Sequence, residues 1–197
     1  MTQKLTQADI DIAAKTLGVN SATVRAVLAV EAAGSGFLAD GRVKVQFEPH
    51  VMYRQLKDKF GQARADAELV AHPDLVALKA GSYQSLDKED RDMERAAKEI
   101  DRDCALESAS WGLPQIMGYH WKTCGYPSLQ SFLNDMYRSE GGQLNAFVKF
   151  IIADSRLLNA LRSRDWAVFA RVYNGPGYAK NKYDEKLAAE YSRFLKA

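Results

Sequence analysis

Residues 24–48 read VRAVLAVEAAGSGFLADGRVKVQFE, and the spacing of their apolar side chains changes halfway along. The first part carries apolar residues and one acid at helical spacing, namely Val24, Val27, Leu28 and Glu31. After the break at Gly34-Ser-Gly36, apolar and polar residues alternate from Val43 to Phe47, which is typical of a strand. Asp40-Gly41 supplies a hairpin turn signal just before it. The stretch predicts a helix that ends in an acid, followed by a small β-hairpin.

The remainder of the chain is predicted to be mostly helical. A capping box at Thr6-Gln-Ala-Asp9 starts a first helix, which Gly18 ends. Further helices are expected over 49–60 and 87–101, and almost continuously after Trp111. No internal repeat or low-complexity linker is present. We therefore expect one domain over residues 1–197, of the α+β class and mostly α, with one small hairpin in its N-terminal half.

The composition is that of an ordinary globular protein, with 47% apolar and 26% charged residues among 197. No apolar run approaches the length of about 18 residues that a membrane span needs. The first ten residues, MTQKLTQADI, lack the apolar region of a secretory signal peptide. We therefore expect synthesis in the cytoplasm, with a separate factor releasing the protein to any target outside it.

Charge is unevenly distributed along the chain. The net charge is only +2, which gives no indication of nucleic-acid binding. Residues 138–197 nevertheless carry 11 Lys and Arg against 6 Asp and Glu, a difference of +5. This basic C-terminal third favours either an ordinary solvated helical surface or contact with an anionic polymer or membrane.

Glu31 is the candidate catalytic residue that the pattern favours most. A carboxylate at a helix C-terminus opposes the helix dipole, and apolar neighbours such as Val27 and Leu28 disfavour its charged form. Both effects raise the pKa, as is required of a carboxylic acid that donates a proton near neutral pH. The alternative is a surface Glu at a frayed helix end.

Cleavage of a glycosidic bond is one reaction that such an acid can catalyse, and it normally needs a second carboxyl group. Two residues are candidates for this second group. Asp40 precedes a glycine in the hairpin turn, where Asp is expected for backbone reasons alone. Glu48 shares a strand face with Lys44 and Gln46, opposite the apolar residues. If the apolar face packs on the core, Glu48 points toward the groove beside Glu31. We therefore prefer Glu48, and Asp40 stays open.

Two later segments also carry candidate binding residues. Trp111-Gly-Leu-Pro-Gln-Ile-Met117 reads as a short apolar helix that is either core or a sugar site. In the second interpretation Trp111 is a sugar platform and the Gln115 amide binds an N-acetyl group. Tyr173-Asn-Gly-Pro-Gly177 is a turn by composition, in which Tyr173 and Asn174 are candidate groove residues.

Chemistry based on a metal or a thiol has little support. The three histidines, His50, His72 and His120, show no zinc-ligand spacing, so we expect no metal and no cofactor. Cys104 and Cys124 lack an activating context and are expected to be free thiols. A zinc amidase or a thiol peptidase is therefore disfavoured, and a non-catalytic wall-binding module would leave Glu31 unexplained.

Four segments in order resemble the N-acetylmuramidase family of phage endolysins, within the lysozyme superfamily. They are Glu31-Ala-Ala-Gly-Ser-Gly-Phe37, Phe47-Glu-Pro-His50, Ala109-Ser-Trp-Gly-Leu-Pro-Gln-Ile-Met117 and Tyr173-Asn-Gly175, and the resemblance runs from about residue 20 to the C-terminus. It implies a lysozyme-like fold, no cofactor, and cleavage of the β-1,4 bond after N-acetylmuramic acid in peptidoglycan of Gram-negative hosts.

The resemblance also implies roles for individual residues. Glu31 would be the catalytic acid, Glu48 matches a Phe-Glu-x-His segment of the family, and three residues would line the groove: Gln115, Tyr173 and Asn174. Lytic transglycosylases usually have Glu-Ser where this chain has Glu31-Ala32, and Leu-Met-Gln where it has Leu113-Pro114-Gln115. These departures favour hydrolysis and leave transglycosylation as the alternative.

The expected partners follow from this resemblance. We expect a monomer that binds peptidoglycan glycan strands in the periplasm and binds no nucleic acid. The C-terminal segment carries an apolar stripe, formed by Tyr183, Leu187, Tyr191 and Leu195, with basic residues beside it. Core packing explains this stripe best, and weak contact with an anionic membrane surface is the alternative.

Overall fold

The computed structural model describes residues 4–32, 34–81 and 85–196, and helices dominate these ranges. The α-helices are α1 (Gln7–Leu17), α2 (Ser21–Glu31), α3 (Pro49–Phe60), α4 (Gln62–Ala71), α5 (Leu86–Glu99), α6 (Arg102–Glu107), α7 (Leu129–Arg138), α8 (Glu140–Ala153), α9 (Ser155–Ser163), α10 (Trp166–Asn174) and α11 (Tyr183–Leu195). Two 3-10 helices, η1 (Gly118–Trp121) and η2 (Pro176–Asn181), lie among them. The predicted class, α+β and mostly α, is confirmed.

The first two helices begin and end where their sequence signals predict. The Thr6 hydroxyl accepts from the Asp9 N–H while the Asp9 carboxylate accepts from the Thr6 N–H, so the capping box is complete. Gly18 ends α1 with φ at 71°, a conformation that glycine adopts without steric cost. Asn20 caps α2, which carries Glu31 as its last residue.

A three-stranded antiparallel sheet consists of β1 (Val45–Phe47), β2 (Ala109–Trp111) and β3 (Ile116–Met117), in that order. The alternation predicted for the first strand is confirmed, since Val43, Val45 and Phe47 are buried and the polar residues between them are half-buried. The expected hairpin is smaller than predicted. A single bridge pairs Phe37 with Val43 around Asp40-Gly41, and regular pairing starts only at Val45.

The prediction of a short helix over residues 111–117 is wrong. This segment is a hairpin in which β2 and β3 pair Ser110 with Met117 and Trp111 with Ile116. Gly112 and Gln115 reverse the chain with φ values of 69° and 51°. The pairing of β2 with β1, more than 60 residues earlier, supplies hydrogen bonds that local periodicity does not reveal.

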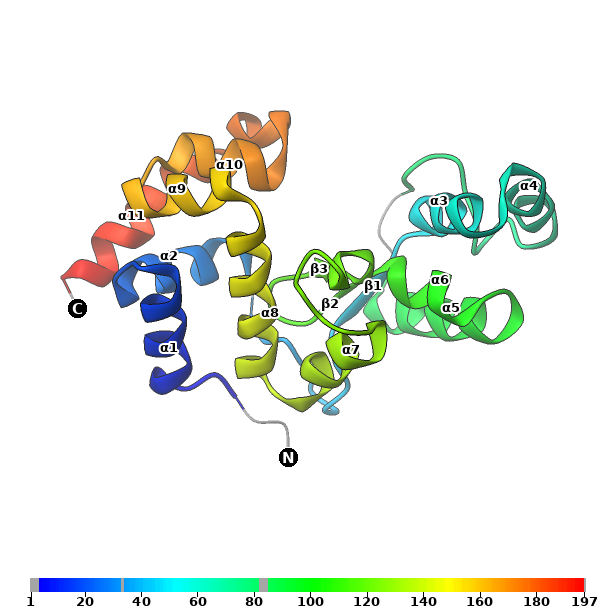
Figure 1. Ribbon diagram of the computed structural model, residues 1–197, viewed down its shortest axis with the longest axis horizontal. Coiled ribbons are helices and arrows are strands. Elements are labelled where there is room, and N and C mark those ends of the chain that lie inside the picture. Colours follow the sequence, from blue (N-terminus) through cyan, green and yellow to red (C-terminus); the bar gives the residue numbers. More distant parts are fainter. Residues whose placement is uncertain (1–3, 33, 82–84, 197) are drawn as a thin grey trace.

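Helix α8 runs through the middle of the molecule (Figure 1). On one side lie α1, α2 and the C-terminal helices α9, α10 and α11, and on the other lie the sheet and α3 to α7. Seven of the 14 residues of α8 are buried, as its central place requires. The chain passes from one side to the other between α2 and β1, and Glu31 is the last residue of α2.

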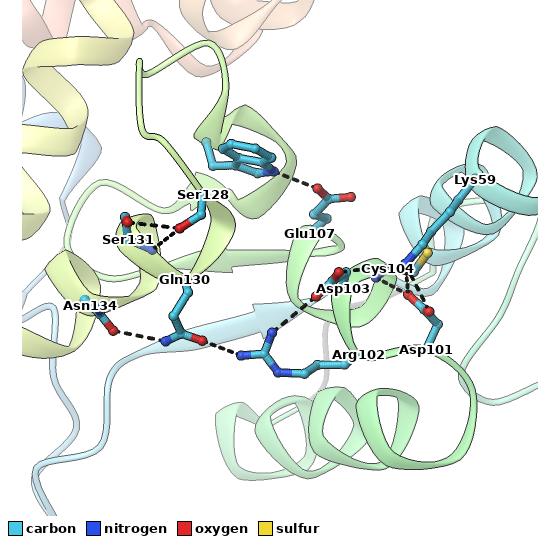
Figure 2. Close-up of polar contacts among 11 residues, drawn as sticks. Lys59, Asp101, Arg102, Asp103, Cys104, Glu107, Ser128, Gln130, Ser131 and Asn134 are labelled. Atoms are coloured by element: carbon cyan, nitrogen blue, oxygen red, sulfur yellow. Dashed lines mark hydrogen bonds and ion pairs between the residues drawn. The ribbon is translucent and has the colours of Figure 1, made fainter.

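A polar network fastens α6 to its neighbours (Figure 2). Lys59 of α3 donates to Asp101, which also caps α6 by accepting from the Cys104 N–H at 2.8 Å. Arg102 donates to Gln130 of α7 at 2.6 Å, and the Trp121 indole donates to Glu107 at 2.7 Å. These contacts fix η1 and α7 against α6.

The expectation of two free thiols is confirmed, because Cys104 and Cys124 are both buried and unbridged. Burial raises the pKa of Cys124 to about 11 and that of Cys104 further still, so both thiols are protonated at neutral pH. Neither has the character of a nucleophile.

The stripe on α11 packs inward. Leu187 is fully buried, and the Tyr191 ring lies 5.6 Å from that of Trp166 at the start of α10, whereas Leu195 is exposed. Core packing therefore accounts for most of the stripe, as the sequence favoured. Within the described ranges, no helix is both long and apolar enough to cross a bilayer.

Candidate active site

Glu31 and Asn174 meet at the ends of two helices. Glu31 is the last residue of α2 and Asn174 is the last residue of α10. The Asn174 side-chain amide donates to Glu31 Oε1 at 3.0 Å. Both side chains are half-buried, so the carboxyl group is held by the Asn174 amide and keeps a face to solvent.

The electrostatic surroundings of Glu31 suit a proton donor. Burial raises its pKa above the ordinary value and outweighs two opposing effects, the hydrogen bond from Asn174 and the positive charge of Lys186 on α11. Both opposing effects favour the carboxylate that forms when the proton is given away. The site thus holds an acid that is protonated over a wider pH range and whose conjugate base is still stabilised.

Tyr173 fastens this site to the turn between β2 and β3. Its hydroxyl donates to the Pro114 carbonyl at 3.2 Å, and its ring stacks on Phe169 and meets Phe147 edge-on. Burial first, and then the nearby Glu31 charge, hold the pKa of Tyr173 well above its usual range. Tyr173 is therefore a neutral residue that positions the groups around Glu31.

Gln115 directs its amide into its own turn. Its side-chain N–H donates to the Gly112 carbonyl at 2.8 Å, and its side-chain oxygen accepts from the Ser110 hydroxyl at 3.0 Å. These bonds stabilise the left-handed conformation of Gln115. Gln115 follows Pro114, whose carbonyl accepts a hydrogen bond from Tyr173. Gln115 is therefore part of the turn that borders the site.

Trp111 is not a sugar platform. Its side chain is 0% exposed, and its indole N–H donates to the Leu106 carbonyl at 3.0 Å inside the core. Its partner in β1 is Val45, which is also buried, so strand geometry turns the ring toward the core. Of the two interpretations left open by the sequence, a core residue or a sugar platform, the first is therefore correct for Trp111.

The two candidates for the second carboxylate lie in different surroundings. Asp40 accepts from the backbone and the guanidinium of Arg42 within the turn, and its side chain is 52% exposed. Glu48 lies directly before α3 as its N-cap residue, with its side chain 15% exposed and Oε2 at 3.3 Å from His50 Nδ1. Glu48 borders a pocket of about 340 Å³ that Arg54, Met117 and Tyr119 also line.

A row of aromatic residues runs from the site around Glu31 to the pocket beside Glu48. It was not identified from the sequence. Ring centroids lie 6.1 Å apart between Tyr173 and Phe150, 4.8 Å between Phe150 and His120, and 4.3 Å between His120 and Tyr119. Tyr119 then lines the pocket beside Glu48. We call these four residues the aromatic row. Their proximity can be seen only in the folded structure, because they come from η1, α8 and α10.

Burial lowers the pKa of His120, so the ring is neutral at neutral pH and the row carries no fixed positive charge. Among the described residues, no group of three or more His, Cys, Asp or Glu side chains is arranged to hold a metal ion. The chemistry that these described side chains can supply is acid–base chemistry at Glu31, with aromatic and amide surfaces nearby.

Comparisons with known proteins show which family this chain resembles. A family model described as Muramidase, N-acetylmuramidase, matches residues 20–195. The crystal structure of an endolysin from Burkholderia phage AP3 is similar, with a TM-score of 0.91 and 47% sequence identity. That match covers 99% of this chain and 73% of the endolysin chain. No curated protein sequence matches.

Proposed function

Because the chain belongs to the N-acetylmuramidase family, we propose that it is a phage endolysin that hydrolyses the β-1,4 bond between N-acetylmuramic acid and N-acetylglucosamine. The observation that carries the proposal is the half-buried Glu31 carboxyl group, with raised pKa, held by Asn174. In this proposal Glu31 is the general acid.

The reaction requires one proton transfer at the scissile oxygen. Glu31 gives its proton to the glycosidic oxygen as the bond to C1 breaks, and a water molecule adds to C1 and releases one proton to the solvent. The Glu31 carboxylate that forms is stabilised by the Asn174 N–H and the positive charge of Lys186. Glu31 then regains a proton from water for the next cycle.

The aromatic row supports a path for the glycan strand. Aromatic faces pack against the apolar faces of sugar rings, and this row runs from Tyr173 beside the acid to Tyr119 beside Glu48. We propose Glu48 as the second carboxyl group, and Gln115 as a residue that holds the turn bordering this path.

We propose a monomer that binds glycan strands and no nucleic acid, acting in the periplasm after release from the host cytoplasm. Any contact with an anionic membrane would use the basic residues on the outer face of α11, since Leu187 on the inner face is buried.

The chemistry of the released fragments tests the proposed reaction. Mass spectrometry of muropeptides from digested sacculi should show reducing N-acetylmuramic acid ends. Anhydro-muramic ends would establish the alternative, a lytic transglycosylase on the same fold. Free stem peptides would point to an amidase or peptidase, and binding to sacculi without release of fragments would point to a wall-binding module.

Asn174→Ala should slow the reaction and shift its pH dependence. The loss of one hydrogen bond, worth about 0.5–1.5 kcal/mol, predicts a rate lower by about two- to tenfold. Since the Asn174 bond lowers the pKa of Glu31, its removal should move the basic limb of the pH–rate profile to higher pH.

The matched control is Asn159→Ala, on the exposed surface of α9, which should keep both the rate and the profile. If Asn174→Ala retains the wild-type rate and basic limb, the contact between Asn174 and Glu31 has no part in catalysis.

A further inference from the structure

Two buried polar side chains on α8 hold the two loops that flank Glu31. Glu140, 6% exposed, begins α8, and Gln143 lies one turn further and is fully buried. Glu140 contacts the loop that follows α2, and Gln143 contacts both that loop and the turn after β2. Neither residue was singled out in the sequence.

The Glu140 carboxylate accepts three hydrogen bonds. Oε1 accepts from the Ser35 hydroxyl at 2.6 Å and the Gly36 N–H at 2.9 Å, and Oε2 accepts from the Leu5 N–H at 2.9 Å. Burial acts to raise the pKa of Glu140, but these three bonds outweigh it and hold the pKa below its ordinary value. The group is therefore ionised, and its bonds are charge-assisted.

Gln143 completes the contact with both loops. Its side-chain oxygen accepts from the Leu113 N–H at 2.7 Å, and its N–H donates to the Met136 and Gly36 carbonyls at 2.9 and 3.4 Å. A Cβ atom at Gly36 or Gly112 would overlap the Gln143 amide, so these glycines permit the close approach.

The loop after α2 has space to move if it is released. A pocket of about 280 Å³ lies beneath the end of α2 and is lined by Ala32, Gly34 and Glu140, among others. Ser35 and Gly36 follow Glu31 by four and five residues, so a change in their position acts on the end of α2. Glu140 lines this pocket and binds Ser35 and Gly36 at its edge.

We propose that Glu140 is a positioning residue for Glu31, fixing the loop after α2 so that Glu31 stays half-buried against Asn174. This rests on the proposed role of Glu31 as the acid. Glu140 itself does not touch the reacting atoms. Its loss should let water reach the Glu31 carboxyl group and misplace it relative to Asn174.

Glu140→Gln tests the inference. Both oxygens of the carboxylate accept hydrogen bonds, whereas the amide places an N–H group opposite the Leu5 or the Ser35 donor, and that hydrogen bond is lost. We expect kcat on a soluble glycan fragment to fall by about tenfold to 10²-fold, with KM changed less than about twofold. Titration of the Glu31 carboxyl carbon by NMR should show its midpoint moving down toward the ordinary glutamate value.

Two further variants keep the test decisive. Ser35→Ala removes one of the three bonds from an exposed residue, so it should fold and shift the same midpoint in the same direction by less. Glu68→Gln is the matched control, a buried, ion-paired glutamate on α4, and should lower the melting temperature without moving kcat or the midpoint.

An unchanged Glu31 midpoint in Glu140→Gln would overturn the inference and make Glu140 merely structural. If Glu140→Gln does not fold, an unchanged midpoint in Ser35→Ala overturns it instead. The NMR midpoint does not depend on activity. If Glu31 is not the catalytic acid, its midpoint still shifts in Glu140→Gln. That outcome would contradict the proposed function and not the inference about Glu140.

Discussion

Glu31→Gln is expected to abolish lysis of outer-membrane-permeabilised cells while the fold stays intact. Gln keeps the size of the side chain and can still accept from the Asn174 amide, but it cannot protonate a leaving oxygen. General acid catalysis typically contributes about 10²–10⁴-fold, so the rate should fall by that order. Turbidity clearing with purified protein measures it.

The thermal stability of the Glu31→Gln variant should change in the opposite direction to its activity. The folded-state pKa of Glu31 is raised, so the folded protein holds this proton to higher pH than the unfolded chain does. Stability is therefore lost as pH rises from the unfolded pKa through the folded one. Glu31→Gln removes that loss, and its melting temperature at neutral pH should equal or exceed that of the wild type.

A surface glutamate close by provides the control. Glu185→Gln lies on α11, with its side chain 66% exposed in an ion pair with Lys182, and should clear cells at the wild-type rate. If Glu31→Gln retains more than about a tenth of wild-type activity, Glu31 is not the acid, since general acid catalysis contributes far more than tenfold.

Glu48→Gln is expected to cost at least about tenfold in kcat at an unchanged melting temperature. Glu48 is half-buried between β1 and α3, and it lines the pocket at the end of the aromatic row, where a glycan strand following the row would meet it. Asp40→Asn should cost little, because Asn serves a turn nearly as well and Asp40 already bonds to Arg42.

The steady-state constants distinguish the roles open to Glu48. A fall in kcat supports action at the scissile bond, whereas a rise in KM alone would make Glu48 a binding residue. An inactive Asp40→Asn together with an active Glu48→Gln would reverse the assignment and place the second carboxylate in the turn.

Much of the fold could be predicted because its signals are local. The capping box at Thr6, the glycine at position 18 and the alternation from Val43 to Phe47 each act within a few residues. The helix-terminal place of Glu31 followed from the same kind of signal. These features required no knowledge of what packs against them.

Features that depend on distant partners could not be predicted. The segment from Trp111 to Met117 has an apolar pattern that suits a helix, but pairing with β1 makes it a hairpin and turns Trp111 into the core. The aromatic row and the contacts of Glu140 arise in the same way, from segments that meet only after folding.

The pKa of Glu31 offers the most direct test of the central claim. The basic limb of kcat/KM reports the essential acid of the free enzyme, and NMR titration of the Glu31 carboxyl carbon reports the same group independently. We predict that the two midpoints coincide and lie above the ordinary glutamate value. A Glu31 midpoint at the ordinary value, or one unrelated to the basic limb, would contradict the assignment of Glu31 as the acid that cleaves the glycan strand.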